Sequence, residues 1–186
     1  MALQDRFLEA EIELRFTLEQ GLKQRGKRHG ETVAAIRDLG RVVALQGRQE
    51  EAEALLRAAF SIQAGFNAPL RWRPAVEIRK YLGATLIAQR KWRQAMAEFD
   101  AIAGDWSRSA AVNAASLYGD TLVAWALLRT GRTDEARRYA AAAFEWRREA
   151  YGPGHRRTAE ALAVLAAVQA QLGERQAAVR DRKSVV

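Results

Sequence analysis

The chain repeats a turn motif at a period of about 42 residues, and a period of this length points to stacked structural units. The motif occurs at four positions, separated by 43, 41 and 42 residues: Gly47, Arg90, Gly131 and Gly173. An alanine follows each of these positions by five residues: Ala52, Ala95, Ala136 and Ala178. The recurrence predicts a fold built by repetition of one small unit.

Each unit has the apolar spacing of two helices joined by the turn. Before the first turn, apolar or small residues recur at i, i+3, i+4 and i+7: Ile36, Leu39, Gly40 and Val43. After it, the spacing continues with Ala52, Leu56 and Ala59. Glycine at the turn ends the first helix in a left-handed conformation. We also expect small residues where paired helices approach closely, namely Gly40, Gly83, Ala124 and Ala166.

The pattern predicts a single all-α domain over residues 1–186. It contains an opening helix at 4–24, then helix pairs at 31–46 with 49–64, 74–89 with 92–103, 109–130 with 133–150, and 156–172 with 175–184. The repeats therefore span 31–64, 74–103, 109–150 and 156–184. One pair cannot bury enough apolar surface to fold alone, so the pairs must stack. We expect a solenoid of antiparallel helical hairpins with a concave and a convex face.

These residues resemble the tetratricopeptide repeat (TPR) family. The resemblance is carried by Leu39, Gly40, Ala52 and Leu56 in one unit and by their counterparts in the others, such as Leu82, Gly83, Ala95 and Phe99. The 42-residue period is similar to the extended variety found in kinesin light chains and many bacterial proteins. The resemblance implies a right-handed α-α superhelix. The sequence departs from the family pattern at Arg79 and Asp120, where an apolar residue is usual, and at Arg90 in the second turn.

The sequence predicts a protein that is not an enzyme and holds no cofactor or metal. Cysteine is absent, which excludes disulfides, thiolate metal sites and thiol nucleophiles. The two histidines, His29 and His155, lie in equivalent loops three repeats apart, so we do not expect them to share a site. No P-loop, dinucleotide-binding glycine motif or HExxH motif occurs.

Localisation and charge restrict the possible partners. No apolar run long enough for a membrane helix occurs, and Asp5, Arg6 and Glu9 interrupt the region where a signal peptide would be apolar. We therefore expect a cytoplasmic protein without membrane contact. The net charge of +8 suits nucleic acid, an anionic surface or an acidic partner. Because 25 of the 30 basic residues are arginine, a GC-rich genome explains this charge equally well.

The resemblance implies a protein-interaction scaffold whose first helices line a concave groove. The predicted groove residues are Arg37, Arg41, Lys80, Tyr118, Thr121, Trp125 and Arg129. Arginine can bind a carboxylate with two parallel hydrogen bonds, and Trp and Tyr often anchor apolar side chains. The predicted partner is thus a protein or peptide segment, in particular an acidic one. The alternative is that these are ordinary solvated residues, with Trp125 packed between helices.

Three further interpretations stay open. Nucleic-acid binding is the less favoured alternative, because no polar pair recurs at equivalent sites as it does in pentatricopeptide RNA readers. A second is a self-associating scaffold, such as a homodimer formed through uncapped ends. The third follows from the resemblance: similar bacterial arrays adjoin CHAT-type protease domains or signalling ATPases, which implies a regulatory part of a larger protein.

Overall fold

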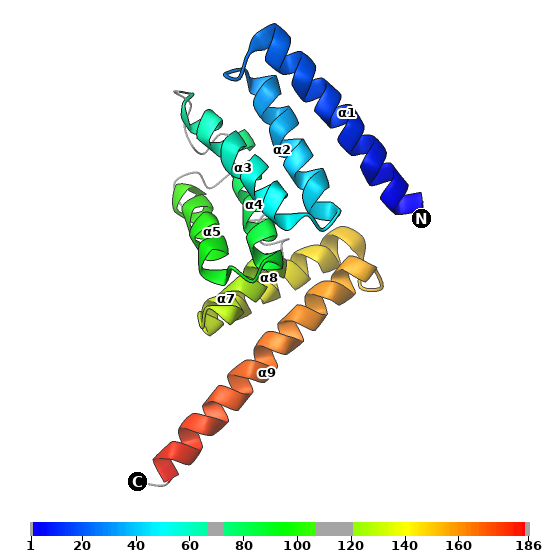
Figure 1. The fold of residues 1–186 in the computed structure, drawn as a ribbon. Coiled ribbons are helices and arrows are strands. Elements are labelled where there is room, and N and C mark those ends of the chain that lie inside the picture. The colour runs from blue at the N-terminus through cyan, green and yellow to red at the C-terminus, as the bar shows by residue number, and fades with distance from the viewer. Residues whose placement is uncertain (1, 67–72, 107–120, 185–186) are drawn as a thin grey trace. The chain divides into compact units, whose positions relative to one another are not determined.

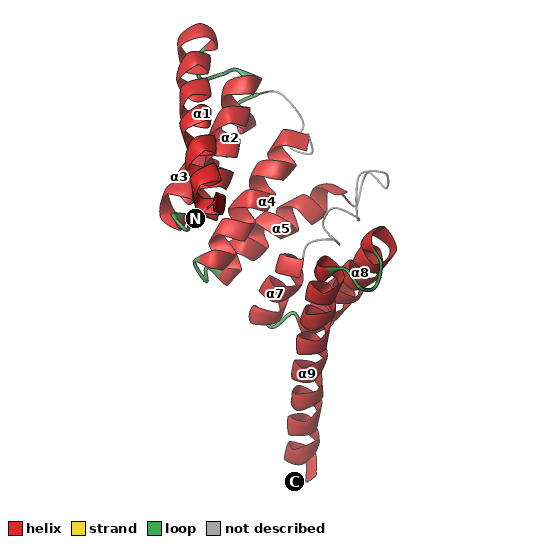
Figure 2. Ribbon diagram, turned by 90° about the vertical axis from the view of Figure 1, so that its right-hand side faces the viewer, coloured by secondary structure: helices red, strands yellow, loops and turns green. Residues whose placement is uncertain are grey.

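The computed structural model describes residues 2–66, 73–106 and 121–184, and all regular elements in these ranges are α-helices. The predicted all-α repeat fold is therefore confirmed. The helices belong to two compact units, Met1–Ser109 and Ala110–Val186. Figures 1 and 2 show the helices of each unit from two directions.

Unit 1 is a series of antiparallel helices in which each helix packs against the next along the chain. Its helices are α1 (Ala2–Arg25), α2 (Gly30–Leu45), α3 (Gln49–Ala64), α4 (Arg73–Ala88) and α5 (Trp92–Trp106). In addition, α2 contacts α4, so the first helices of successive hairpins are neighbours (Figure 1). The sequence-based ranges 31–46 with 49–64 and 74–89 with 92–103 correspond to α2–α3 and α4–α5.

Unit 2 contains α7 (Thr121–Arg129), α8 (Thr133–Tyr151) and α9 (Arg156–Ser184). Here α7 packs against both α8 and α9, and α8 packs against α9. The first part of the predicted helix 109–130 lies outside the described residues, as does Asp120. The remainder of this predicted helix, from Thr121 onward, corresponds to α7.

The turns at Gly47, Arg90 and Gly131, where the repeated motif recurs, share one backbone geometry. Gly47 and Gly131 have φ angles of 86° and 84°, and Arg90 has a φ of 59°. In each turn the amide of this residue donates to the carbonyl three positions earlier, and the next amide donates to the carbonyl five positions earlier. This is the hydrogen-bond pattern that ends a helix on a left-handed residue. Arg90 therefore adopts the glycine conformation, although its Cβ makes that conformation unfavourable.

Small residues permit close helix pairing where the sequence predicts it. A Cβ atom on Gly40 would lie 2.9 Å from Cγ of Leu56, and one on Gly83 would lie 2.6 Å from Cζ of Phe99. Ala124 is completely buried on α7. The expectation is confirmed at Gly40 and Gly83, and the burial of Ala124 agrees with it. It is wrong for Ala166, which is exposed on α9.

The last predicted hairpin is also wrong. The sequence predicts a turn at Gly173 between helices 156–172 and 175–184, whereas α9 runs without interruption from Arg156 to Ser184 (Figure 1). In the first hairpin, Leu55 and Leu56 pack against Gly40. Asp181 and Arg182 occupy the two equivalent positions. Arg182 would place a charge where the other second helices bury Leu56, Phe99 and Ala140, and burying an unpaired charge is costly, which disfavours a second hairpin here.

Candidate protein-interaction surface

The side of α2 and α4 that faces away from the core of unit 1 is polar. On the core side, Val33 and Ile36 of α2 cluster with Ala59 of α3 and Ile78 of α4. Since helical side chains three and four residues apart share a face, the other side of both helices presents a separate set. We call this set the α2–α4 face; it comprises Arg37, Asp38, Arg41, Glu77, Lys80 and Tyr81.

Arg37 is already bound by carboxylates of the chain itself. Its Nη1 atom donates to Oε2 of Glu77 at 2.9 Å. Its Nε and Nη2 atoms donate to the two carboxylate oxygens of Asp38 at 2.9 and 3.0 Å. The hydrogen bond with Asp38 is the main cause that raises the pKa of the Arg37 guanidinium. An incoming carboxylate would have to displace one of these partners.

Arg41 lies one helical turn further along α2 and is exposed. Its Cζ atom lies 5.7 Å from the ring centroid of Tyr81, within range of a cation–π interaction. Among the described residues, its guanidinium forms neither a hydrogen bond nor an ion pair. Arg41 is therefore oriented by an aromatic ring while its donors remain available. Lys80 is half-buried on α4 and already has an interaction within the chain.

In unit 2, the predicted residues lie on α7. Trp125 is half-buried, and Cζ of Arg129 lies 5.7 Å from the Trp125 ring centroid. Thr121 is the first residue of α7 and is half-buried. Tyr118 lies outside the described residues. By the repeat spacing, Trp125 occupies the position equivalent to Arg41, which places an aromatic side chain where unit 1 has a cation.

Sequence reasoning missed Tyr81 and Asp38 on the α2–α4 face. A signal for Tyr81 existed in the spacing. Two of the pairs that join α2 to α4, Arg37 with Glu77 and Arg41 with Tyr81, are each 40 residues apart. Side chains that contact each other between neighbouring first helices are thus separated in sequence by slightly less than one repeat period. Asp38 had no comparable signal, because it binds its own neighbour in sequence.

Family models described as tetratricopeptide repeat match residues 113–181 and residues 32–64. Together these two segments span more than half of the 186 residues. The chain belongs to the tetratricopeptide repeat family. No curated protein matches its sequence.

Solved structures agree with this assignment at the level of the fold. Two crystal structures of a Podosopora anserina putative kinesin light chain with nearly identical TPR-like repeats are similar to the chain, each at 18% sequence identity. The first has a TM-score of 0.72 and covers 98% of this chain and 87% of that chain. The second has a TM-score of 0.71, with coverages of 95% and 85%.

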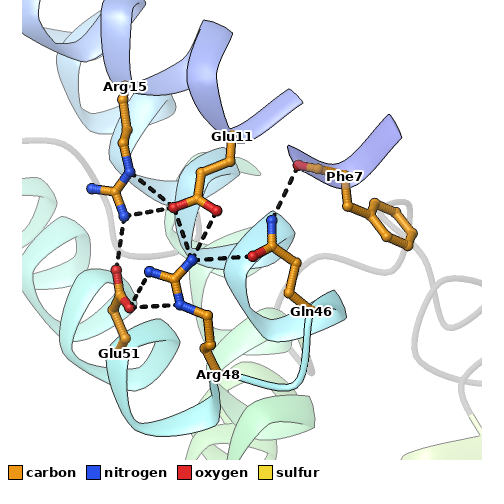
Figure 3. A network of polar contacts seen from close by, with 6 residues as sticks. All are labelled: Phe7, Glu11, Arg15, Gln46, Arg48 and Glu51. Atoms are coloured by element: carbon orange, nitrogen blue, oxygen red, sulfur yellow. Dashed lines mark hydrogen bonds and ion pairs between the residues drawn. The ribbon is translucent and has the colours of Figure 1, made fainter. Parts of the chain in front are cut away.

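The TPR hairpins of unit 1 are joined by an ionic cluster that the sequence did not predict (Figure 3). We call it the first clasp; it consists of Glu11, Arg15, Gln46, Arg48 and Glu51. Glu11 of α1 is only 7% exposed and accepts hydrogen bonds from Arg15 at 2.6 and 2.9 Å. It also accepts from Nη1 of Arg48 at 2.8 and 2.9 Å. The clasp therefore ties α1 to the turn between α2 and α3.

The first clasp strongly favours the ionised form of Glu11. Burial acts to raise the pKa of this carboxyl, but hydrogen bonds from Arg15, Gln46 and Arg48 outweigh burial and lower the pKa to about 2. Glu51 bridges the two arginines, accepting from Arg15 at 2.9 Å and from Nε of Arg48 at 2.9 Å. Its pKa is lowered as well, mainly by Arg48.

A second clasp occurs one repeat later. Glu53 of α3 accepts hydrogen bonds from Gln89 and Lys91 at 2.8 Å each and from Arg57 at 2.9 Å. Burial raises the pKa of Glu53, and the same three partners lower it to about 2. Its members lie 42 or 43 residues after Glu11, Arg15, Gln46 and Arg48. This recurrence was the sequence signal that could have revealed both clasps.

The two histidines have equivalent structural roles at helix starts. Nδ1 of His29 accepts from the amide of Glu31 at 3.3 Å, and Nδ1 of His155 accepts from the amide of Arg157 at 3.1 Å. A side-chain acceptor at this place satisfies an amide that has no partner within the helix. In the described part of the chain, no group of His, Asp and Glu is arranged to hold a metal ion. None of the described helices has the length and apolar character of a membrane-crossing segment.

Proposed function

We propose that the chain is a non-enzymatic TPR scaffold that binds an acidic peptide segment on the α2–α4 face, with Arg41 as the main carboxylate anchor. TPR proteins generally mediate protein–protein interaction. The observation that carries the proposal is the state of Arg41, an exposed guanidinium beside an aromatic ring and without a carboxylate partner among the described residues.

The chemistry of the face supports an acidic ligand. A guanidinium presents donors in a planar fork that matches a carboxylate, and the cation–π contact with Tyr81 restricts its orientation before binding. Preorganised donors lose less conformational entropy when a ligand binds. The Tyr81 ring also offers a contact for an apolar side chain next to the bound carboxylate. Lys80 adds positive charge nearby, although it already has an interaction within the chain, whereas the charge of Arg37 is compensated by Asp38 and Glu77.

The same proposal assigns Trp125 and Arg129 to ligand contact in unit 2. Trp125 stands at the position equivalent to Arg41, and Trp and Arg are the residue types that most often dominate binding energy at interfaces. Thr121 and Tyr118 complete the proposed set.

The experiment is fluorescence anisotropy with the full chain and a labelled peptide rich in Asp and Glu. We expect Arg41→Glu to weaken binding at least about tenfold, which corresponds to about 1.4 kcal/mol. The double variant with Lys80→Glu should weaken it further, and circular dichroism should report unchanged helix content. The matched control is Arg93→Glu, which makes the same charge change at an exposed residue of α5.

The control distinguishes binding at a defined site from attraction of the peptide by the overall positive charge of the protein. Equal losses in Arg41→Glu and Arg93→Glu would mean that the net charge of +8, rather than the α2–α4 face, attracts the peptide. Unchanged affinity in Arg41→Glu would refute the assignment of this residue. A role beside a CHAT-type protease or signalling ATPase stays a prediction from the resemblance, which sequencing the surrounding reading frame tests. A cytoplasmic location stays a prediction from the charged residues near the start of the sequence and the lack of a long apolar run.

A further inference from the structure

Helix α1 has a second apolar face in addition to the one that packs on the rest of unit 1. Leu8, Ile12 and Phe16 are 54%, 66% and 59% exposed. Their spacing of four residues places them in one row along the helix, which we call the outer stripe. On the core side of α1, Leu14 and Leu18 pack against a cluster of α2 and α3. The helix is therefore apolar on two sides, whereas a surface helix normally buries only one.

The repeat itself does not require the outer stripe. Three positions on each later second helix are equivalent to Leu8, Ile12 and Phe16. They hold Glu50, Ala54 and Ala58 on α3, Arg93, Ala97 and Ala101 on α5, and Asp134, Arg138 and Ala142 on α8. Every one of these residues is charged or small. Large apolar side chains at this place are thus particular to α1, and a row of exposed large apolar residues commonly marks an interaction site.

The two edges of the outer stripe differ in charge. Glu9 and Glu13 lie on one edge, each three residues before an apolar member of the stripe and hence beside it on the helix surface. Both are exposed, and within the described residues neither forms a hydrogen bond or an ion pair. The other edge carries Arg15, whose charge is neutralised in the first clasp by Glu11 and Glu51. The stripe therefore presents apolar surface with one acidic border.

We propose that the outer stripe binds an amphipathic helix of another protein, with an apolar row facing the stripe and lysine or arginine along the edge beside Glu9 and Glu13. Three anchors at i, i+4 and i+8 span about 12 Å, which suits a partner helix of a few turns. This surface is distinct from the α2–α4 face. It also has the opposite charge preference, since complementary charge favours a basic partner here.

The acidic border argues against two other occupants. In an antiparallel pair of two α1 helices related by a two-fold axis, Glu9 and Glu13 would lie beside the same residues of the second copy. Like charges so placed oppose association. An anionic membrane surface would repel the same carboxylates, because its potential is negative. A basic amphipathic helix can pack its apolar row on the outer stripe and pair its positive charges with Glu9 and Glu13.

The test uses the full chain and two labelled model peptides of the same length. Both peptides are amphipathic helices with one leucine row; one carries lysine along the edge of that row and the other carries glutamate. We expect the lysine peptide to bind wild-type protein at least about tenfold more tightly than the glutamate peptide. Ile12→Glu should abolish that binding, whereas Ala54→Glu, the same change at the equivalent exposed position of α3, should not.

A charge reversal gives the decisive result. In the double variant Glu9→Lys with Glu13→Lys, the preference should invert, so that the glutamate peptide binds more tightly. The proposal is overturned if wild-type protein binds neither peptide, if it binds both equally, or if Ile12→Glu retains full affinity. It is also overturned if light scattering shows a dimer that Ile12→Glu dissociates, because the occupant would then be a second copy. Arg41→Glu should leave binding of the lysine peptide intact, which separates this surface from the α2–α4 face.

Discussion

Replacing Glu11 by glutamine should destabilise unit 1 in a manner that depends on pH. The substitution keeps the size of the side chain and removes the charge at the centre of the first clasp. The clasp lowers the pKa of Glu11 from 4.5 to about 2. At about 1.4 kcal/mol per pKa unit, this shift sets an upper limit of roughly 3 kcal/mol on the stabilisation. Because Arg15 and Arg48 are 48% and 42% exposed, solvent screening reduces the expected loss at neutral pH to about 1–2 kcal/mol.

The pH dependence has a definite sign. The pKa of Glu11 is lower in the folded state than in the unfolded chain, so its contribution is complete above the unfolded value of 4.5. The contribution is lost as the pH falls through about 2, where the folded protein also takes up the proton. The difference between wild type and Glu11→Gln should therefore be constant near neutral pH and disappear at strongly acidic pH.

Urea unfolding followed by circular dichroism over a series of pH values measures this difference. Hydrogen–deuterium exchange of α1 and α2 then assigns the loss to unit 1. Glu9→Gln is the control, because Glu9 lies on the same helix, is exposed and has no partner among the described residues. The reasoning is refuted if Glu11→Gln costs no more than Glu9→Gln at neutral pH. It is equally refuted if the difference persists at a pH near 2.

Three further predictions concern the turns, the close helix pairing and nucleic acid. Arg90→Gly should stabilise the protein by up to about 1 kcal/mol in thermal unfolding, because Arg90 has a positive φ of 59°, whereas Gly47→Ala should destabilise it by a similar amount. Gly83→Ala should cost about 1–3 kcal/mol in urea unfolding, since its Cβ would lie 2.6 Å from the Phe99 ring. In a background with Phe99→Leu this cost should shrink, and an unchanged cost would contradict the packing argument. Binding of random oligonucleotides should be weak at physiological salt and fall steeply with added salt; saturable, salt-resistant binding would instead favour the nucleic-acid alternative.

Much of the fold follows from local pattern in the sequence. The helices of the first two hairpins are predictable because apolar spacing and turn residues both lie within a window of about one repeat. In the last hairpin Gly173 and Ala178 match the turn pattern, but Arg182 stands at the position where the other second helices bury Leu56, Phe99 and Ala140. A turn signal shows where a chain can reverse, and buried apolar surface decides whether it does so.

The candidate sites were less predictable, because they depend on pairs of residues from different repeats. The sequence singled out Arg37 and Arg41 as equivalent cations. Only the structure distinguishes Arg37, which is bound to Asp38 and Glu77, from Arg41, which has no carboxylate partner among the described residues. The outer stripe was missed for a different reason. Leu8, Ile12 and Phe16 fit a helical period, and spacing alone does not show that another row of the same helix fills the core.

The two clasps bear on how a chain of this kind can grow. Each clasp joins an acidic residue of one hairpin's second helix, Glu11 or Glu53, to the turn of the following hairpin. A hairpin such as α2–α3 thus carries both halves of the joint, with Arg48 for the preceding helix and Glu53 for the following turn. A gene duplication that copied this segment in register would insert a unit already able to dock at both ends. The array could lengthen in this way without new mutations at the junctions. The series of clasps stops at α5, where Met96 stands at the position equivalent to Glu53.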